Sequence, residues 1–387
     1  MSTPEEQDEK SRPGAAVELR PEVSALPAYV PGARPLVGVK VHKLSSNENP
    51  YPPLPSVVER LHDVLAELHR YPDLAAVDLV AALAGRLSDD AVASDAAEPG
   101  ASAVMPENIV VGNGSVAVLS HILDAVVRPG DEVVYPWRSF EAYPIAVAIA
   151  GGEAVEVPLA PDASLDVDAL AAAVTPRTRA VVVCTPNNPT GPAVTHTEVL
   201  RLLAAVPRDV LVLVDEAYLE FVRQDDAVDG VALLVDHPNV VLLRTFSKAY
   251  GLAGLRVGYA VASVELAAGI RAVSTPFGVS AVAQAAAVAS LEARDELFDR
   301  VERIVRERGR VLDALRAQGW PVPDSQANFV WFPVGDAAVA FAQAASERGL
   351  LVRPFAGDGV RVSIGDEEAN DVLLAFAAQV AERFLER

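Results

Sequence analysis

The stretch that decides the fold is TFSKAYGLAGLRVG, residues 245–258, which follows the apolar run NVVLLR at 239–244. Consecutive apolar residues without polar alternation are typical of a strand covered on both faces, as in a parallel sheet. The stretch itself holds one lysine, Lys248, and one arginine, Arg256, among small residues, glycines and hydroxyls. The sequence therefore places an isolated lysine where a buried strand ends.

Other apolar or β-branched runs precede this one, and longer helical patterns separate them. The predicted strands are 108–111, 131–135, 153–158, 179–184, 209–214 and 239–244, and the predicted helices include 114–127, 140–150, 166–174 and 197–205. Strands that alternate with helices predict a parallel sheet between two helical layers. The sequence thus indicates an α/β fold with a mostly parallel sheet in a three-layer large domain.

The pattern changes after about residue 275. A long helical pattern at 280–319, expected to bend or break within its length, precedes short strand-like pieces and a closing helix at 367–387. These elements predict a second, smaller α+β domain. We therefore expect four parts: a flexible tail at 1–22, an N-terminal segment at 23–50 that packs near the functional site and the small domain, a large domain at 51–275 and a small domain at 276–387. The Ala/Ser/Asp/Pro-rich segment 88–106 is expected to be a surface loop.

Composition and charge exclude several classes of partner. The 387 residues carry 53 acidic and 32 basic side chains, for a net charge of −21. Nucleic acid and anionic membranes both demand a basic face, so neither is an expected partner. No uninterrupted apolar stretch reaches the length of a membrane span, and the scattered histidines offer no metal-ligand spacing. The single cysteine, Cys184, allows no intramolecular disulfide and favours a reducing, cytoplasmic location.

Polar clusters directly follow four of the predicted strands. They are GNGS at 112–115, TPNNPTG at 185–191, DEAY at 215–218 and TFSK at 245–248. Ligands bind beyond the carboxyl ends of the strands in an open parallel sheet. One site assembled from these four strand ends is therefore the simplest interpretation.

These clusters contain the groups that pyridoxal phosphate (PLP) needs. A lysine near cationic or apolar groups can lose its proton and form a Schiff base, the role that we predict for Lys248. A carboxylate buried behind a strand needs a cation, so Asp215 is the candidate partner of a protonated ring nitrogen. Taken singly, GNGS could be an ordinary loop and Asp215 a helix cap. Together with a lysine they favour a cofactor site, whose predicted phosphate cradle is Gly114, Ser115, Ser247 and Arg256.

The chain resembles the fold-type I PLP-dependent transferases, and among them the class I/II aminotransferases. The resemblance covers about residue 26 to the C-terminus and rests on the motifs LSSNENPY, RYPD, VGNGS, TPNNPTG, DEAY, FSKAYGLAGLRVGY, SQANFV and VRVSIG. It is strongest for the histidinol-phosphate aminotransferase-like subfamily. Within that subfamily, LPAYVPG, WRSFEAYP and SQANFVWFP are most similar to the branch that acts on aromatic amino acids.

The resemblance implies a role for each cofactor-binding residue. Lys248 would bind PLP covalently and shuttle a proton, and Asp215 would keep the pyridine nitrogen protonated. Tyr71 would reach the phosphate bound by the other subunit, which implies a homodimer with shared sites. The other implied contacts are Phe140 stacked on the ring, Asn188 and Tyr218 at its 3′ oxygen, and Gly114, Ser115, Ser247 and Arg256 at the phosphate.

The implied substrate site lies on the small-domain side. Arg361 would clamp the acidic group of the substrate, because a planar two-donor fork suits a carboxylate. Arg353 would assist it. The remaining substrate-binding candidates are Asn328, Tyr29 and Asn49.

The implied activity is transfer of an amino group from phenylalanine, tyrosine or tryptophan to 2-oxoglutarate by a ping-pong mechanism. Histidinol phosphate is the alternative donor, because it would present an anion to the same arginine and a flat ring to the same pocket. Tyr29 and Trp137 would add aromatic surface, which favours the aromatic donors. A decarboxylase acting on an amino acid phosphate shares the fold. A non-catalytic regulator is not expected, because the short acidic N-terminus leaves no room for a DNA-binding domain.

Overall fold

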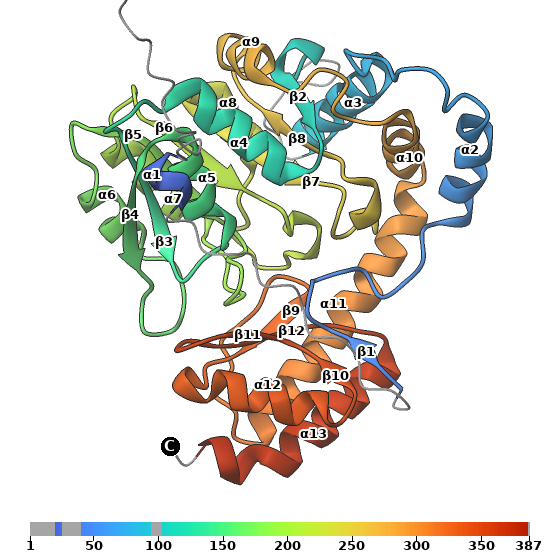
Figure 1. Cartoon of the computed structure of the whole chain (residues 1–387), viewed down its shortest axis with the longest axis vertical. Helices are drawn as coiled ribbons and strands as arrows, with labels where there is room; N and C mark the ends of the chain where they lie inside the picture. Colours follow the sequence, from blue (N-terminus) through green and yellow to red (C-terminus); the bar gives the residue numbers. More distant parts are fainter. Residues whose placement is uncertain (1–19, 25–39, 94–102, 386–387) are drawn as a thin grey trace, which may run out of the picture.

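A seven-stranded sheet forms the centre of the larger part of the molecule (Figure 1). The computed structural model describes residues 20–24, 40–93 and 103–385. The strand order is β2-β8-β7-β6-β5-β3-β4, and β8 pairs antiparallel with both its neighbours while every other pair is parallel. The strands are β2 (Ile109–Gly112), β3 (Glu132–Trp137), β4 (Glu153–Pro158), β5 (Thr178–Cys184), β6 (Leu211–Asp215), β7 (Val240–Thr245) and β8 (Gly258–Val261). The mostly parallel sheet predicted from the sequence is confirmed.

Side chains of the central strands alternate between two hydrophobic cores. Val181 and Val212 lie in one core, and their neighbours Val182 and Leu213 lie in the other. Because both faces are buried, these strands have no polar positions to alternate with, which explains their continuous apolar runs. One helical layer is α2 (Pro55–Leu65), α3 (Val77–Ala93), α6 (Val167–Ala172), α7 (His196–Ala205), α8 (Gly230–Asp236) and α10 (Ala281–Glu292), and the other is α4 (Ser115–Val126), α5 (Ala142–Ala150) and α9 (Val264–Val273).

Strand β8 was not anticipated from the sequence. It follows Arg256 and lies between β2 and β7, where Gly258 is in register with both Gly112 and Thr245. A Cβ atom at Gly258 would lie 2.4 Å from the backbone nitrogen of Ser115, so a glycine is required for this close approach. The short strand thereby brings Arg256 to the start of α4.

The prediction of a surface loop at 88–106 is wrong for its first residues, which are helical. Helix α3 continues to Ala93, and a short 3-10 helix, η1 (Pro106–Asn108), precedes β2. Leu83, Leu87 and Ala91 recur at every fourth position and are each at most 1% exposed. This apolar stripe holds the segment against the core, despite its polar composition. Residues 94–102 lie outside the described part of the chain.

The smaller part combines a three-stranded antiparallel sheet, in the order β11-β12-β9, with the two-stranded parallel pair β1-β10. The predicted long helix breaks at Ala293, so that α10 packs on α2 and α3 while α11 runs into the smaller part (Figure 1). The elements are β1 (His42–Lys43), α11 (Arg294–Ala317), β9 (Phe329–Phe332), α12 (Ala338–Ser346), β10 (Leu350–Leu351), β11 (Arg353–Phe355), β12 (Gly359–Ser363) and α13 (Glu367–Leu385).

The four-part division of the chain stays a prediction. Most of the expected tail and residues 25–39 lie outside the described ranges. Strand β1 places the described end of the N-terminal segment beside β10 of the smaller part. Among the helices of the described ranges, none is long and apolar enough to cross a membrane.

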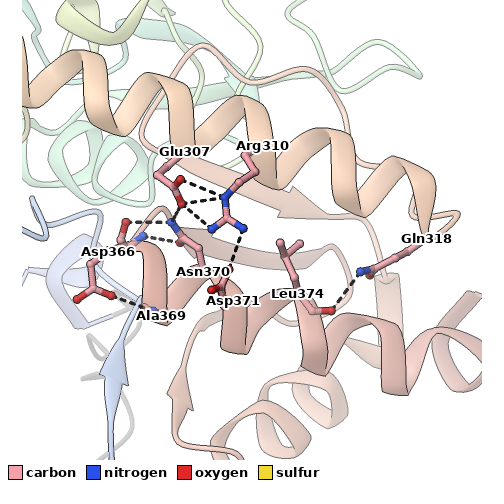
Figure 2. A network of polar contacts seen from close by, with 9 residues as sticks. Glu307, Arg310, Gln318, Asp366, Ala369, Asn370, Asp371 and Leu374 are labelled. Atoms are coloured by element: carbon pink, nitrogen blue, oxygen red, sulfur yellow. Dashed lines mark hydrogen bonds and ion pairs between the residues drawn. The ribbon is translucent and has the colours of Figure 1, made fainter.

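Polar contacts fix α13 against α11 (Figure 2). Asn370 is fully buried and accepts a hydrogen bond from the Gly365 nitrogen at 2.9 Å. Its amide donates to Glu307 Oε2 at 2.9 Å and to the Gly365 oxygen at 3.0 Å. Arg310 bridges Glu307 to Asp371 at the surface. Asn370 thereby holds the turn that follows β12.

Replacing Asn370 should therefore destabilise the protein. We expect Asn370→Ala to lower the free energy of unfolding by about 1–3 kcal/mol, because buried groups of Gly365 and Glu307 lose their partner. The matched control is Asp371→Ala, whose side chain is 67% exposed and whose loss should cost about 1 kcal/mol or less. Urea denaturation measures both, and equal losses would contradict the structural role of Asn370.

Candidate active site

A cavity of about 500 Å³ lies at the carboxyl ends of β5, β6 and β7, facing β11 and β12 of the smaller part. Residues from all four predicted strand-end clusters line it and thus lie together in space. The predicted site residues that line it are Ser115, Phe140, Asn188, Asp215, Tyr218, Ser247, Lys248, Arg256, Arg353 and Arg361.

Asp215 is the last residue of β6 and is 5% exposed. Leu213, two residues earlier, faces the core that contains α5, and the two-residue period of a strand directs Asp215 to the same side. There the Tyr143 hydroxyl donates to Asp215 Oδ2 at 2.7 Å, and the Ala217 nitrogen donates to Oδ1 at 3.3 Å. Burial raises the pKa of Asp215 to about 6, and these two hydrogen bonds oppose the rise. Neither donor is a cation, so the carboxylate would be stabilised by a positively charged ligand.

Lys248 lies in the turn after β7 and points into the same cavity. Its Nζ donates to the Ser46 oxygen at 3.2 Å and lies 5.7 Å from the centroid of the Tyr218 ring. Burial, assisted by the guanidinium groups of Arg361 and Arg256, lowers the pKa of Lys248 from 10.5 to about 7. Much of the amine is therefore neutral near pH 7, which is the form that attacks a carbonyl carbon.

An anion cradle lies where α4 begins. Gly114 has a φ of 84°, and a Cβ atom there would lie 2.3 Å from Arg256 Nη2, so only glycine lets the guanidinium lie against the helix start. Arg256 Nη1 donates to Ser247 Oγ at 3.3 Å. A phosphate group could accept hydrogen bonds here from the backbone N–H of Ser115 at the start of α4, from the Arg256 guanidinium and from the Ser247 hydroxyl.

Phe140 and Tyr143 lie on the same side of the cavity. Their rings pack edge to face with centroids 5.6 Å apart, at an interplanar angle of 87°. Tyr143 is 1% exposed and thus contacts both the aromatic residue predicted to stack on a ring and Asp215. Tyr143 belongs to the motif WRSFEAYP together with Phe140 and was not predicted as a site residue from the sequence.

Asn47 supports the opposite side of the cavity and was also missed. It is 1% exposed, and its amide donates to the Tyr218 hydroxyl at 2.9 Å. The backbone oxygen of Asn47 accepts from Asn328 Nδ2 at 3.1 Å. Asn47 lies in the LSSNENPY motif, in which the sequence had pointed to Asn49 as the substrate-binding residue. Asn49 Nδ2 donates to the Ala249 oxygen at 2.9 Å, and Asn49 is not among the residues that line the cavity.

Arg353 and Arg361 lie opposite each other on β11 and β12. Arg361 Nη2 donates to the Ser45 oxygen at 2.7 Å, and its Nη1 donates to Asn188 Oδ1 at 2.5 Å. Arg353 Nη2 forms an ion pair with Glu141 Oε2 at 2.9 Å. Glu141 also lines the cavity and was not anticipated.

Besides Gly114 and Asn49, three more predicted residues lie away from the cavity lining or outside the described residues. Asn328 is fully buried behind the cavity, in contact with Asn47. Tyr71 is 83% exposed, and its ring packs against Phe277 with centroids 4.8 Å apart. Tyr29 lies outside the described residues. The roles assigned to these residues stay predictions.

Comparison with known proteins identifies the family. The family model of aminotransferase class I and II matches residues 39–376, which is most of the chain. The chain belongs to this family. The resemblance inferred from the motifs is thus confirmed, and the protein is an aminotransferase.

Relatives of this aminotransferase match over nearly its whole length. It is 51% identical over 368 residues to an aromatic amino acid aminotransferase of Streptomyces coelicolor, covering 95% of this chain and 97% of that protein. A protein of the same name from Thermobifida fusca is 49% identical over 367 residues, which cover 94% of this chain and 98% of that protein. The crystal structure of histidinol-phosphate aminotransferase from Sinorhizobium meliloti in complex with pyridoxal-5′-phosphate aligns with a TM-score of 0.81 at 30% identity, over 95% of this chain and 99% of that chain. The expected fold-type I architecture is confirmed.

The lowered pKa of Lys248 can be measured directly. With cofactor removed, the rate at which Lys248 reacts with an amine-selective reagent should rise through a midpoint near pH 7, since only the neutral amine reacts. Peptide mapping by mass spectrometry isolates this residue, and exposed Lys40 on the same chain provides the reference. A midpoint for Lys248 close to 10.5 would show that burial does not perturb the amine.

Proposed function

We propose that this aminotransferase moves the amino group of an aromatic L-amino acid to 2-oxoglutarate, with pyridoxal phosphate as its cofactor and ping-pong kinetics. The observation that carries the proposal is one cavity in which Lys248, Asp215 and the Arg256 cradle face one another. The names of relatives that are 51% and 49% identical support an aromatic donor.

The residues of the cavity fit pyridoxal phosphate. The cradle at Gly114, which a Cβ atom would fill, offers backbone amides and a guanidinium to the phosphate. The buried carboxylate of Asp215, whose two donors are neutral, offers a partner to a protonated ring nitrogen. The face of Phe140 is available to the ring, and Asn188 and Tyr218 lie within the same lining for its 3′ oxygen.

The cofactor, when bound, supplies an aldehyde for the substrate amine and a protonated ring that accepts the electron pair released at the substrate Cα. Asp215 keeps the ring nitrogen protonated, because a buried carboxylate stabilises a cation beside it. Lys248 Nζ, a substantial fraction of which is neutral near pH 7, takes the proton from Cα and returns it in the reverse half-reaction. Arg361 binds the substrate carboxylate and so fixes the Cα–H bond relative to Lys248.

We also propose that the enzyme is a cytoplasmic homodimer with shared sites. Around Tyr71, which is 83% exposed, the side chains of Leu74 and Val77 are 62% and 59% exposed, and Phe277 is 43% exposed. Clustered exposed apolar side chains favour a subunit interface. Across such an interface Tyr71 would reach the phosphate cradle of a second copy. The buried state of the single cysteine, Cys184, is compatible with a reducing compartment.

The donor can be tested by comparing kcat/KM for phenylalanine and for histidinol phosphate, each with 2-oxoglutarate. We expect phenylalanine to be preferred, and Lys248→Ala to lower both activities by at least about 10²-fold, because the general base is lost. A large preference for histidinol phosphate would overturn the proposed donor but not the aminotransferase activity. Release of CO₂ without an oxo acid would instead indicate decarboxylation.

The shared site can be tested with mixed dimers. Tyr71→Phe and Arg256→Ala each remove one contact to the phosphate, from different subunits in the proposed arrangement. Each variant alone should retain the cofactor poorly, whereas mixed dimers should regain some intact sites, to about a quarter of the total in a random mixture. Cofactor absorbance after gel filtration measures retention. No recovery in any mixture would contradict the shared site.

A further inference from the structure

Two arginines that line the cavity, Arg353 and Arg361, lie directly opposite each other on adjacent strands. Arg353 and Arg361 are direct partners in the antiparallel pairing of β11 and β12, so their side chains leave the same face of the sheet. Like charges directly opposite each other on a sheet are destabilising. Arg361 is held by the Ser45 oxygen and Asn188. The charge of Arg353 is compensated from the other side of the cavity.

Glu141 provides that compensation. It occupies the residue before α5, where an acidic side chain could cap the helix, yet its carboxylate makes no capping hydrogen bond. Instead Glu141 Oε2 lies 2.9 Å from Arg353 Nη2. The side chains of Arg353 and Glu141 are only 16% and 39% exposed, so this pair is less screened by water than an ordinary surface pair.

The charges around the cavity show what this pair changes. The described lining residues include four cations, Lys248, Arg256, Arg353 and Arg361, and three carboxylates, Glu48, Glu141 and Asp215. Under the proposed function Lys248, Arg256 and Asp215 serve the cofactor, and Arg361 serves the substrate carboxylate. Glu48 is paired with Lys43 at 2.7 Å. Arg353 and Glu141 are thus left to neutralise each other, and they form a part of the cavity wall that carries no net charge, called the neutral wall below.

An apolar surface lies beside this neutral wall. Phe355 lines the cavity, with its ring centroid 5.8 Å from the guanidinium carbon of Arg353 and 5.7 Å from that of Arg361. Trp331 packs behind it, with ring centroids 5.5 Å apart. An aromatic side chain can lie against such a surface without breaking the ion pair. A side chain that ends in an anion would either meet the Glu141 carboxylate there or have to displace it from Arg353.

We propose that Glu141 is a specificity-determining residue, which occupies Arg353 and thereby selects donors with a neutral aromatic side chain over donors whose side chain ends in an anion. This inference rests on the proposed function and deepens it. A dicarboxylate acceptor such as 2-oxoglutarate must compete with Glu141 for Arg353 through its distal carboxylate. Glu141 therefore also weakens binding of the acceptor.

The test is the variant Glu141→Gln, which keeps the size of the side chain and removes its charge. The ratio of kcat/KM for L-aspartate, whose side chain ends in a carboxylate, to that for phenylalanine should rise about tenfold, because removing a close like charge is typically worth that much. Binding provides a second readout that needs no turnover. By calorimetry, the Kd of glutarate should fall by a similar factor, while the Kd of 3-phenylpropionate should change by less than about twofold.

A matched control is available in the neighbouring ion pair. Arg138 Nη2 lies 2.6 Å from Asp358 Oδ2, with side chains 22% and 37% exposed, and neither residue lines the cavity. Asp358→Asn therefore removes a comparable link between the larger and smaller parts without changing the charge of the cavity wall. It should leave the substrate ratio within about twofold of the wild type, because this pair is equally part-exposed but lies outside the cavity lining.

A double-mutant cycle decides whether Glu141 acts through Arg353. In an Arg353→Gln background, Glu141→Gln should shift the ratio far less than in the wild type, since no masked guanidinium is left to release. A ratio that is unchanged in Glu141→Gln, or one that rises equally without Arg353, overturns the inference. If the wild type itself fails on phenylalanine, the proposed function fails first, and the two failures are thus distinguished.

Discussion

The site depends on a carboxylate that is buried at the end of a central strand. Asp215 ends β6 with 5% of its surface exposed, and its two hydrogen-bond donors, Tyr143 and Ala217, are neutral. A buried anion is costly, and burial raises the pKa of Asp215 to about 6 although the charge of Lys248 and the two hydrogen bonds oppose the rise. Under the proposed function, a protonated ring nitrogen beside Asp215 would remove this cost.

The same burial acts on Lys248 in the opposite direction. An ammonium group is a cation, so loss of water favours the neutral amine and lowers its pKa. Together with the positive groups around it, above all Arg361, burial brings this pKa to about 7. Burial in one cavity therefore brings the pKa of both a carboxyl group and an amine near neutral pH. Neither residue would have these properties at the protein surface.

The cavity is completed by segments that are distant in the sequence. The larger part supplies the strand ends and the cradle at α4, whereas the smaller part supplies Arg353 and Arg361. Ser45 and Ser46, next to β1, touch Arg361 and Lys248 through their backbone oxygens. Contacts such as that of Glu141 with Arg353 therefore join the parts at the place where substrate specificity would be set.

The sequence by itself determined the sheet and the positions of its functional strand ends. Apolar runs buried on both faces cannot be mistaken for amphipathic strands, and in a parallel sheet their carboxyl ends meet at one edge. Lys248, Asp215, Asn188 and Arg256 each lie a few residues from such a run or within its motif, so local sequence was enough to locate them.

Only the tertiary structure decided which side chains support these residues. The contacts of Tyr143 with Asp215, Asn47 with Tyr218 and Glu141 with Arg353 span 72, 171 and 212 positions. No local pattern encodes such pairs, because their partners are brought together by strand order and by the packing of the two parts. The short strand β8 and the helical residues 88–93 were missed for the same reason: packing against neighbouring elements overrode what their own composition suggested.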